Sequence, residues 1–76
     1  MESYLALANA VIELAVKDYR EALVRLHTFP ERAEYQREVA NLESFFHSGW
    51  YEMLTDLDAE YLMTGVRRLV REAVTG

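Results

Sequence analysis

The most aromatic part of this chain reads Phe45-Phe46-His47-Ser48-Gly49-Trp50-Tyr51-Glu52-Met53-Leu54. This aromatic segment contains the single Trp, two of the three Phe and one of the five Tyr residues of a 76-residue sequence. Large aromatic side chains dominate the energetics of a protein core. We therefore expect the other segments to pack around the aromatic segment, with Trp50 buried. The Ser48-Gly49 pair is typical of a joint between two helices.

A long amphipathic helix is predicted over residues 4–27, before the aromatic segment. Its apolar residues recur at alternating three- and four-residue steps, a spacing that places them on one face of a helix. The expected core-facing side chains are Leu5, Ala8, Ile12, Ala15, Tyr19, Ala22 and Leu26, with Val11, Val16 and Leu23 beside them.

Pro30 marks the boundary between this helix and a second one. Proline lacks the N–H that a helix interior needs, but it is favourable in a first helical turn. The second helix is therefore expected to begin near Pro30, with Thr28 or Phe29 as its N-cap, and to end near His47. Its expected core-facing side chains are Tyr35, Val39, Leu42 and Phe46, with Phe45 beside them.

Two further helices are predicted after the Ser48-Gly49 joint, the first from Trp50 to about Leu54 and the second from about Ala59 to Ala73. The N-cap candidates of the last helix are Thr55, Asp56 and Asp58. Its expected core-facing side chains are Leu62, Val66, Leu69, Val70 and Ala73. Three arginines, Arg67, Arg68 and Arg71, are expected to point outward, near the negative end of the helix dipole.

No segment alternates apolar and polar residues with period two, so no strand is predicted. We expect an all-α fold in a single domain over residues 1–76. It should be a small bundle of two long antiparallel helices, a short third helix and a fourth helix that closes over the aromatic segment. A chain of this length buries only about 60% of its unfolded surface, so its stability should be modest.

Composition and charge narrow the classes of partner. The chain has no Cys, which excludes disulfides and thiolate zinc sites and fits a reducing compartment. Its 13 acidic and 8 basic residues give a net charge of -5, which disfavours nucleic acid and anionic membranes and suits a basic protein partner. Glu2 and the charges that follow it interrupt the apolar N-terminus, so neither a signal peptide nor a membrane span is predicted. A cytoplasmic protein is expected.

No catalytic, metal-binding or cofactor-binding motif is apparent. Asp56, Asp58 and Glu60 occupy alternate positions, as at the start of a calcium loop. The sixth and twelfth positions of such a loop would be Tyr61 and Arg67, where glycine and glutamate are required, so the motif fails. The two His residues, His27 and His47, lie near helix ends, where a His is electrostatically favourable. We expect no enzymatic activity and no cofactor.

Two sets of residues are candidates for binding a partner. Leu7, Val11 and Leu14 form a second apolar ridge on the first helix, which could seat the C-terminal helix, a second subunit or another protein. The acids Glu52, Asp56, Asp58 and Glu60 cluster around one helix junction and could attract a basic partner. The same acids precede the arginines of the fourth helix. They disfavour a helix-turn-helix interpretation of that helix, because they would repel DNA phosphates.

The chain resembles a group of short uncharacterised proteins encoded by phages and prophages of Gram-positive bacteria. One matching block comprises Ala15-Val16, Asp18-Tyr19-Arg20 and Ala22-Leu23. The other comprises Glu43, Phe45-Phe46, Ser48, Trp50-Tyr51, Leu54-Thr55, Leu57-Asp58, Glu60 and Leu62. Gly49 and Ala59 depart from the pattern of the group, which has an acid or Asn at the first position and Gly at the second. The resemblance implies a phage origin, but it implies no particular activity and identifies no functional residues.

The favoured hypothesis is a non-enzymatic protein that acts by binding a host or phage protein. By analogy with other small phage proteins, it would be an inhibitor of a host defence system, as anti-CRISPR proteins are, or an adaptor. The alternatives are a DNA-binding transcriptional regulator that uses the fourth helix, and an accessory protein of phage assembly or packaging. A homodimer is compatible with each of these.

Overall fold

The computed structural model describes residues 2–75, which form four helices and no strand. The helices are α1 (Glu2–Thr28), α2 (Ala33–Phe46), α3 (Gly49–Leu54) and α4 (Ala59–Thr75). The predicted all-α class is confirmed. The finer prediction of two long helices is not confirmed, because α2 has 14 residues and α4 has 17, against 27 in α1.

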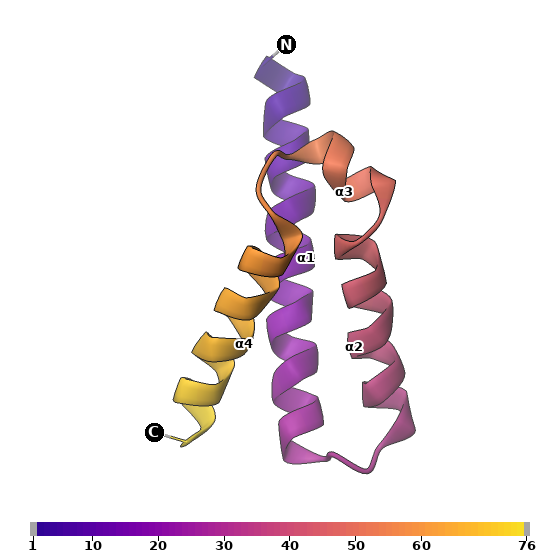
Figure 1. Ribbon diagram of the computed structural model, residues 1–76, viewed down its shortest axis with the longest axis vertical. Coiled ribbons are helices and arrows are strands. Elements are labelled where there is room, and N and C mark those ends of the chain that lie inside the picture. Colours follow the sequence, from indigo (N-terminus) through magenta and orange to yellow (C-terminus); the bar gives the residue numbers. More distant parts are fainter. Residues whose placement is uncertain (1, 76) are drawn as a thin grey trace.

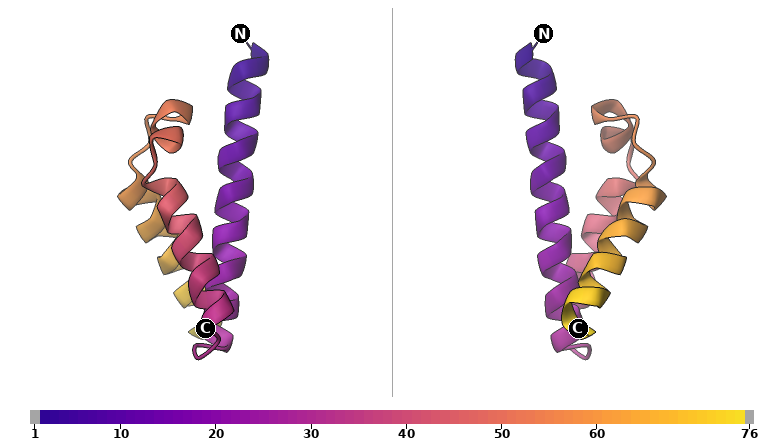
Figure 2. Two further views of the ribbon diagram at one scale, coloured as in Figure 1. Left: turned by 90° about the vertical axis from the view of Figure 1, so that its right-hand side faces the viewer. Right: turned by 90° about the vertical axis from the view of Figure 1, so that its left-hand side faces the viewer.

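The helix α1 is the element around which the others pack, since it contacts each of them. From the turn after α1, α2 runs back antiparallel to it, and α4 then runs in the same direction as α1 (Figure 1). The first turns of α1 extend beyond α3, and the side views show them standing apart from the remaining helices (Figure 2). The radius of gyration is 13.3 Å, against about 11 Å expected for a compact chain of this length, so the molecule is elongated.

The core lies where α1, α2, α3 and α4 meet, and three aromatic rings occupy it. Phe46 is 1% exposed, and its ring centroid lies 5.4 Å from that of Tyr19 and 5.6 Å from that of Tyr51. The other buried apolar side chains are Ala8, Ala22, Val39, Met63, Val66 and Val70. The aromatic segment therefore supplies the core, as predicted, but through Phe46 and Tyr51.

The prediction that Trp50 is buried is wrong, because 70% of this residue is exposed. α3 has only six residues, fewer than two turns, and therefore buries a single narrow face. Tyr51 occupies that face. Trp50 precedes it by one residue, or about 100° around the helix, and so points away from the core.

The predicted core face of α4 is also partly wrong. Leu69 is 64% exposed and Ala73 is exposed, whereas Met63, which the sequence analysis did not select, is fully buried. α4 carries apolar residues on two sides, and the side containing Met63 packs on the core. The predicted core position of Leu5, near the start of α1, is wrong as well, since it is 63% exposed.

The second helix begins at Ala33, three residues later than predicted, and Arg32 is its N-cap rather than Thr28 or Phe29. Residues 29–32 form a turn instead, closed by a 3.1 Å hydrogen bond from the Arg32 N–H to the Phe29 carbonyl oxygen. Pro30 occupies the second position of this turn, where its fixed φ is favourable. The helix therefore starts only after the turn is complete.

Side-chain caps define the starts of α3 and α4. Ser48 Oγ accepts a hydrogen bond from the Tyr51 N–H at 3.4 Å, and Asp58 Oδ2 accepts one from the Tyr61 N–H at 3.3 Å. Asp58 is thus the N-cap of α4 among the three predicted candidates. Thr55 Oγ1 instead accepts a hydrogen bond from the Leu57 N–H within the preceding turn.

Replacing Asp58 by alanine is expected to lower the free energy of unfolding by about 1 kcal/mol, because the cap of α4 is lost. The matched control is Asp56→Ala, which removes an exposed carboxylate two residues earlier and should change stability by less than about 0.5 kcal/mol. Urea denaturation of both variants checks this expectation. Equal losses in the two variants would contradict the assignment of Asp58 as the cap.

Within residues 2–75, none of the helices has the combination of length and apolar character that crossing a membrane requires.

Candidate functional site

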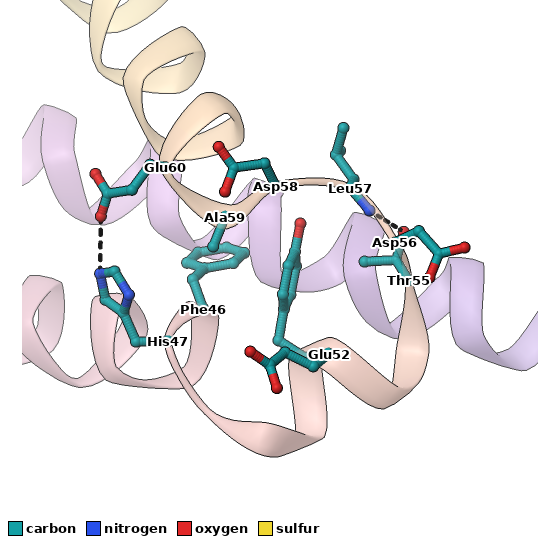
Figure 3. A pocket seen from close by; sticks show the side chains of 10 residues that line it. Phe46, His47, Glu52, Thr55, Asp56, Leu57, Asp58, Ala59 and Glu60 are labelled. Atoms are coloured by element: carbon teal, nitrogen blue, oxygen red, sulfur yellow. Dashed lines mark hydrogen bonds and ion pairs between the residues drawn. The ribbon is translucent and has the colours of Figure 1, made fainter.

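The four acids selected from the sequence line one hollow at the junction of α2, α3 and α4. This acidic hollow has a volume of about 460 Å³. Its lining residues are Phe46, His47, Tyr51, Glu52, Thr55, Asp56, Leu57, Asp58, Ala59 and Glu60. The structure therefore brings Glu52 together with the acids of the α3–α4 turn (Figure 3).

The carboxylates around the acidic hollow do not converge on one point. Glu60 points toward His47, and its Oε2 lies 3.1 Å from His47 Nε2, whereas Glu52, Asp56 and Asp58 point in other directions (Figure 3). Among the described residues, no group of three or more acidic or His side chains could hold a metal ion. This arrangement suits diffuse attraction of positive charge rather than coordination of a single ion.

Tyr51, which the sequence analysis did not identify as a site residue, also lines this hollow. The hydroxyl oxygen is buried and has no hydrogen-bond partner among the described residues. Burial and the nearby Asp58 carboxylate raise the pKa of Tyr51, so the phenol stays protonated at neutral pH. The hollow therefore places exposed acids beside a tyrosine whose hydroxyl oxygen is buried.

The predicted ridge of α1 forms one wall of an apolar groove, and α3 together with Leu42 and Phe45 of α2 forms the opposite wall. One hollow of about 360 Å³ is lined by Leu7, Ala8, Val11, Phe45, Trp50, Met53 and Leu54. An adjoining hollow shares Val11 and Phe45 with it and is lined in addition by Leu14, Ala15, Asp18 and Leu42. We call these two hollows together the α1–α3 groove.

The side chains of the α1–α3 groove are largely exposed. Leu7 is 64% exposed, Trp50 is 70% exposed and Met53 is 71% exposed. None of the described residues of α4 lines the groove, so this part of the C-terminal helix does not cover the ridge of α1. A continuous run of exposed large apolar side chains is typical of an interaction site, whereas single exposed ones are ordinary.

α3 separates the two candidate sites. Tyr51 and Glu52 line the acidic hollow, whereas Trp50, Met53 and Leu54 line the α1–α3 groove. A partner that contacts α3 can therefore meet apolar side chains on one side of it and acids on the other. The sequence analysis selected both sets of residues but could not place them on either side of one short helix.

One of the α4 arginines, Arg67, forms part of a partly buried hydrogen-bond network that we call the tyrosine–glutamate–arginine cluster. Tyr19 donates its hydroxyl proton to Glu43 Oε2 at 2.7 Å. Arg67 donates from Nε to the Tyr19 hydroxyl at 2.9 Å and from Nη2 to Glu43 Oε2 at 3.0 Å. The cluster joins α1, α2 and α4, and its members lie too far apart in sequence for a local pattern to predict it.

The cluster changes the pKa values of its members. Burial, with the hydrogen bond to Glu43, raises the pKa of Tyr19 to about 12. Burial also acts to raise the pKa of Glu43, but the hydrogen bonds from Tyr19 and Arg67 outweigh it and leave that pKa lowered. Arg67 is exposed, as predicted, but its guanidinium also turns back to bond Tyr19 of α1 and Glu43 of α2, which was not predicted.

No protein-family model, curated protein or solved structure shows a significant match to this chain.

Proposed function

We propose that this protein acts by binding a partner protein and not as an enzyme, and that an amphipathic helix of the partner occupies the α1–α3 groove. The observation that carries the proposal is the exposure of Trp50 and Met53 opposite the ridge of α1. Trp is enriched among the residues that contribute most to binding energy, and an exposed indole has no role in the core.

The dimensions of the groove suit a helix. It extends along α1 from Leu7 to Asp18, a distance of roughly 16 Å or three helical turns. Apolar side chains of a partner helix at three- and four-residue spacing would fit between the ridge of α1 and Trp50. Its polar face would remain in water.

The charge of the chain favours a partner helix flanked by Lys or Arg. Asp18 lies at one end of the groove. The acidic hollow lies on the other side of α3 from the groove. The resemblance to phage proteins supports a host bacterial protein as the partner, with inhibition of a defence system or an adaptor role as the outcome. For the alternative of DNA binding, the hydrogen bonds of Arg67 within the fold leave it poorly placed to contact phosphates.

The test is to immobilise the protein, identify captured proteins from a bacterial lysate, and measure the affinity of each purified partner for variants. Trp50→Ala is expected to weaken binding by about 30-fold or more, as for a side chain at the centre of an interface. The matched control is Tyr61→Ala, which removes an equally exposed aromatic ring, 73% exposed, from α4. It should bind the partner as the unmodified protein does.

A second pair of variants separates the roles of groove and acids. Leu7→Glu with Leu14→Glu should abolish binding, whereas Glu52→Lys with Glu60→Lys should slow association and reduce its salt dependence. Both pairs should leave the circular dichroism spectrum unchanged, because all four side chains are exposed. If Tyr61→Ala abolishes binding and Trp50→Ala does not, the groove is not the binding site.

A further inference from the structure

α4 has a second apolar face that the core does not use. Tyr61, Gly65, Leu69 and Ala73 follow one another at four-residue steps and are exposed, and we call this row the α4 ridge. Tyr61 is 73% exposed and Leu69 is 64% exposed. A hollow of about 570 Å³ lies beside the ridge, with Val16 of α1 and Leu57 in its lining. This face shares no lining residue with the groove at Trp50.

Gly65, in the middle of this ridge, has no evident reason within the chain to be glycine. It lies inside α4, where glycine costs about 1 kcal/mol relative to alanine. Its φ is not positive, and a Cβ added there would meet no atom within 4 Å. A glycine at an exposed helix position is favourable where another backbone approaches closely.

We propose that two copies of this protein pair through their α4 ridges, antiparallel and crossing at Gly65. Tyr61 and Leu69 lie four residues to either side of Gly65, so a two-fold axis at Gly65 places Tyr61 of each copy against Leu69 of the other. Such a self-complementary patch is what a two-fold interface requires. Rows of residues spaced by four pack against each other at about -50°, a crossing that brings the backbones closest at its centre.

Charge and surface area agree with this arrangement. Arg68 precedes Leu69 and lines the same hollow, so its guanidinium can stack on the Tyr61 ring of the other copy. The accessible surface of one chain is 5632 Å², whereas a monomer of 8.9 kDa is expected to expose about 4,800 Å². The chain therefore exposes more surface than a compact monomer of its mass, and the exposed Tyr61 and Leu69 of the α4 ridge contribute to it.

Sedimentation equilibrium across a concentration series tests the proposal, with the unmodified protein expected to reach the mass of a dimer. Gly65→Leu should weaken the dimer at least tenfold, because the added side chain separates the two backbones. In the monomer it should not reduce stability, because the new Cβ has open space and leucine is a better helix former. Leu69→Glu should likewise give monomers.

The control is Leu7→Glu, which alters the α1–α3 groove and should leave the dimer intact. Circular dichroism at low concentration establishes that each variant is folded. An unmodified protein that remains monomeric throughout the series would overturn the proposal. So would a Gly65→Leu variant that dimerises as tightly as the unmodified protein, or a dimer that dissociates only on Leu7→Glu. None of these results depends on the partner protein, so this proposal can fail while the proposed function stands.

Discussion

Replacing Phe46 by alanine is expected to lower the free energy of unfolding by about 3–5 kcal/mol, most of the stability of a domain this small. The side chain is 1% exposed, and its ring contacts those of Tyr19, Phe45 and Tyr51. Removing it takes away the ring that connects α1, α2 and α3. The variant should lose its helical circular dichroism at a temperature where the unmodified protein is folded.

The control for this prediction is Trp50→Ala, four residues later in the same aromatic segment. Because 70% of Trp50 is exposed, its removal should cost less than about 1 kcal/mol. Urea denaturation of both variants gives the comparison, and the native fluorescence of Trp50 should be that of an indole in water. A large loss of stability in Trp50→Ala would show that this side chain belongs to the core and would contradict the observation on which the proposed function rests.

Breaking the tyrosine–glutamate–arginine cluster is expected to have the second largest effect on stability. Glu43→Ala should cost about 2–3 kcal/mol, because it removes two hydrogen bonds that involve a charged group and leaves the Tyr19 hydroxyl buried without its acceptor. The matched control is Glu38→Ala, which also removes an α2 glutamate paired with an arginine. The Glu38–Arg25 pair is exposed, so its loss should cost less than about 1 kcal/mol.

The same cluster predicts how stability depends on pH. The pKa of Glu43 is lowered in the folded protein, so its contribution is complete above the pKa of an unfolded glutamate and is lost as the pH falls through the folded value. The pKa of Tyr19 is raised from 10.0 to about 12, so its contribution is complete below pH 10.0 and is lost as the pH rises to about 12.

Urea denaturation over a pH series, with Tyr19→Phe and Glu43→Gln beside the unmodified protein, tests both directions. Tyr19→Phe should reduce the loss of stability at alkaline pH, and Tyr51, whose pKa is also raised, should account for part of what remains. Glu43→Gln should reduce the loss at acid pH. An unmodified protein whose stability is constant from pH 10 to 12 would contradict the alkaline prediction.

Periodicity in the sequence was sufficient to predict the helices, the core face of α2, and that of α1 apart from its first turns, where Leu5 is exposed. In those two helices one face is more apolar than any other, so burial of that face is the only favourable solution. Tyr19, Ala22, Val39 and Phe46 were expected in the core and are buried there. The cap of α4 could be limited to three candidates, because a side-chain cap depends on residues three apart, and the structure selects Asp58 among them.

The candidate site was predictable only as two sets of residues. Leu7, Leu14 and the acids near Glu52 could be selected from the sequence, because ridges and charge clusters are local patterns. That Trp50 and Met53 complete the wall opposite the ridge of α1 could not be predicted, since this depends on how α3 is placed against α1. The partner of either set remains a prediction.

Local spacing thus established where the chain is helical, because hydrogen bonds, caps and turns join residues near one another in sequence. Where two faces of a helix are both apolar, as Met63 and Leu69 show in α4, spacing could not establish which one is buried. The same holds for Trp50 and Tyr51 in α3 and for Arg67, which meets Tyr19 across 48 residues. Those outcomes depend on how the helices pack together, since burial is a property of the assembled core and not of any single helix.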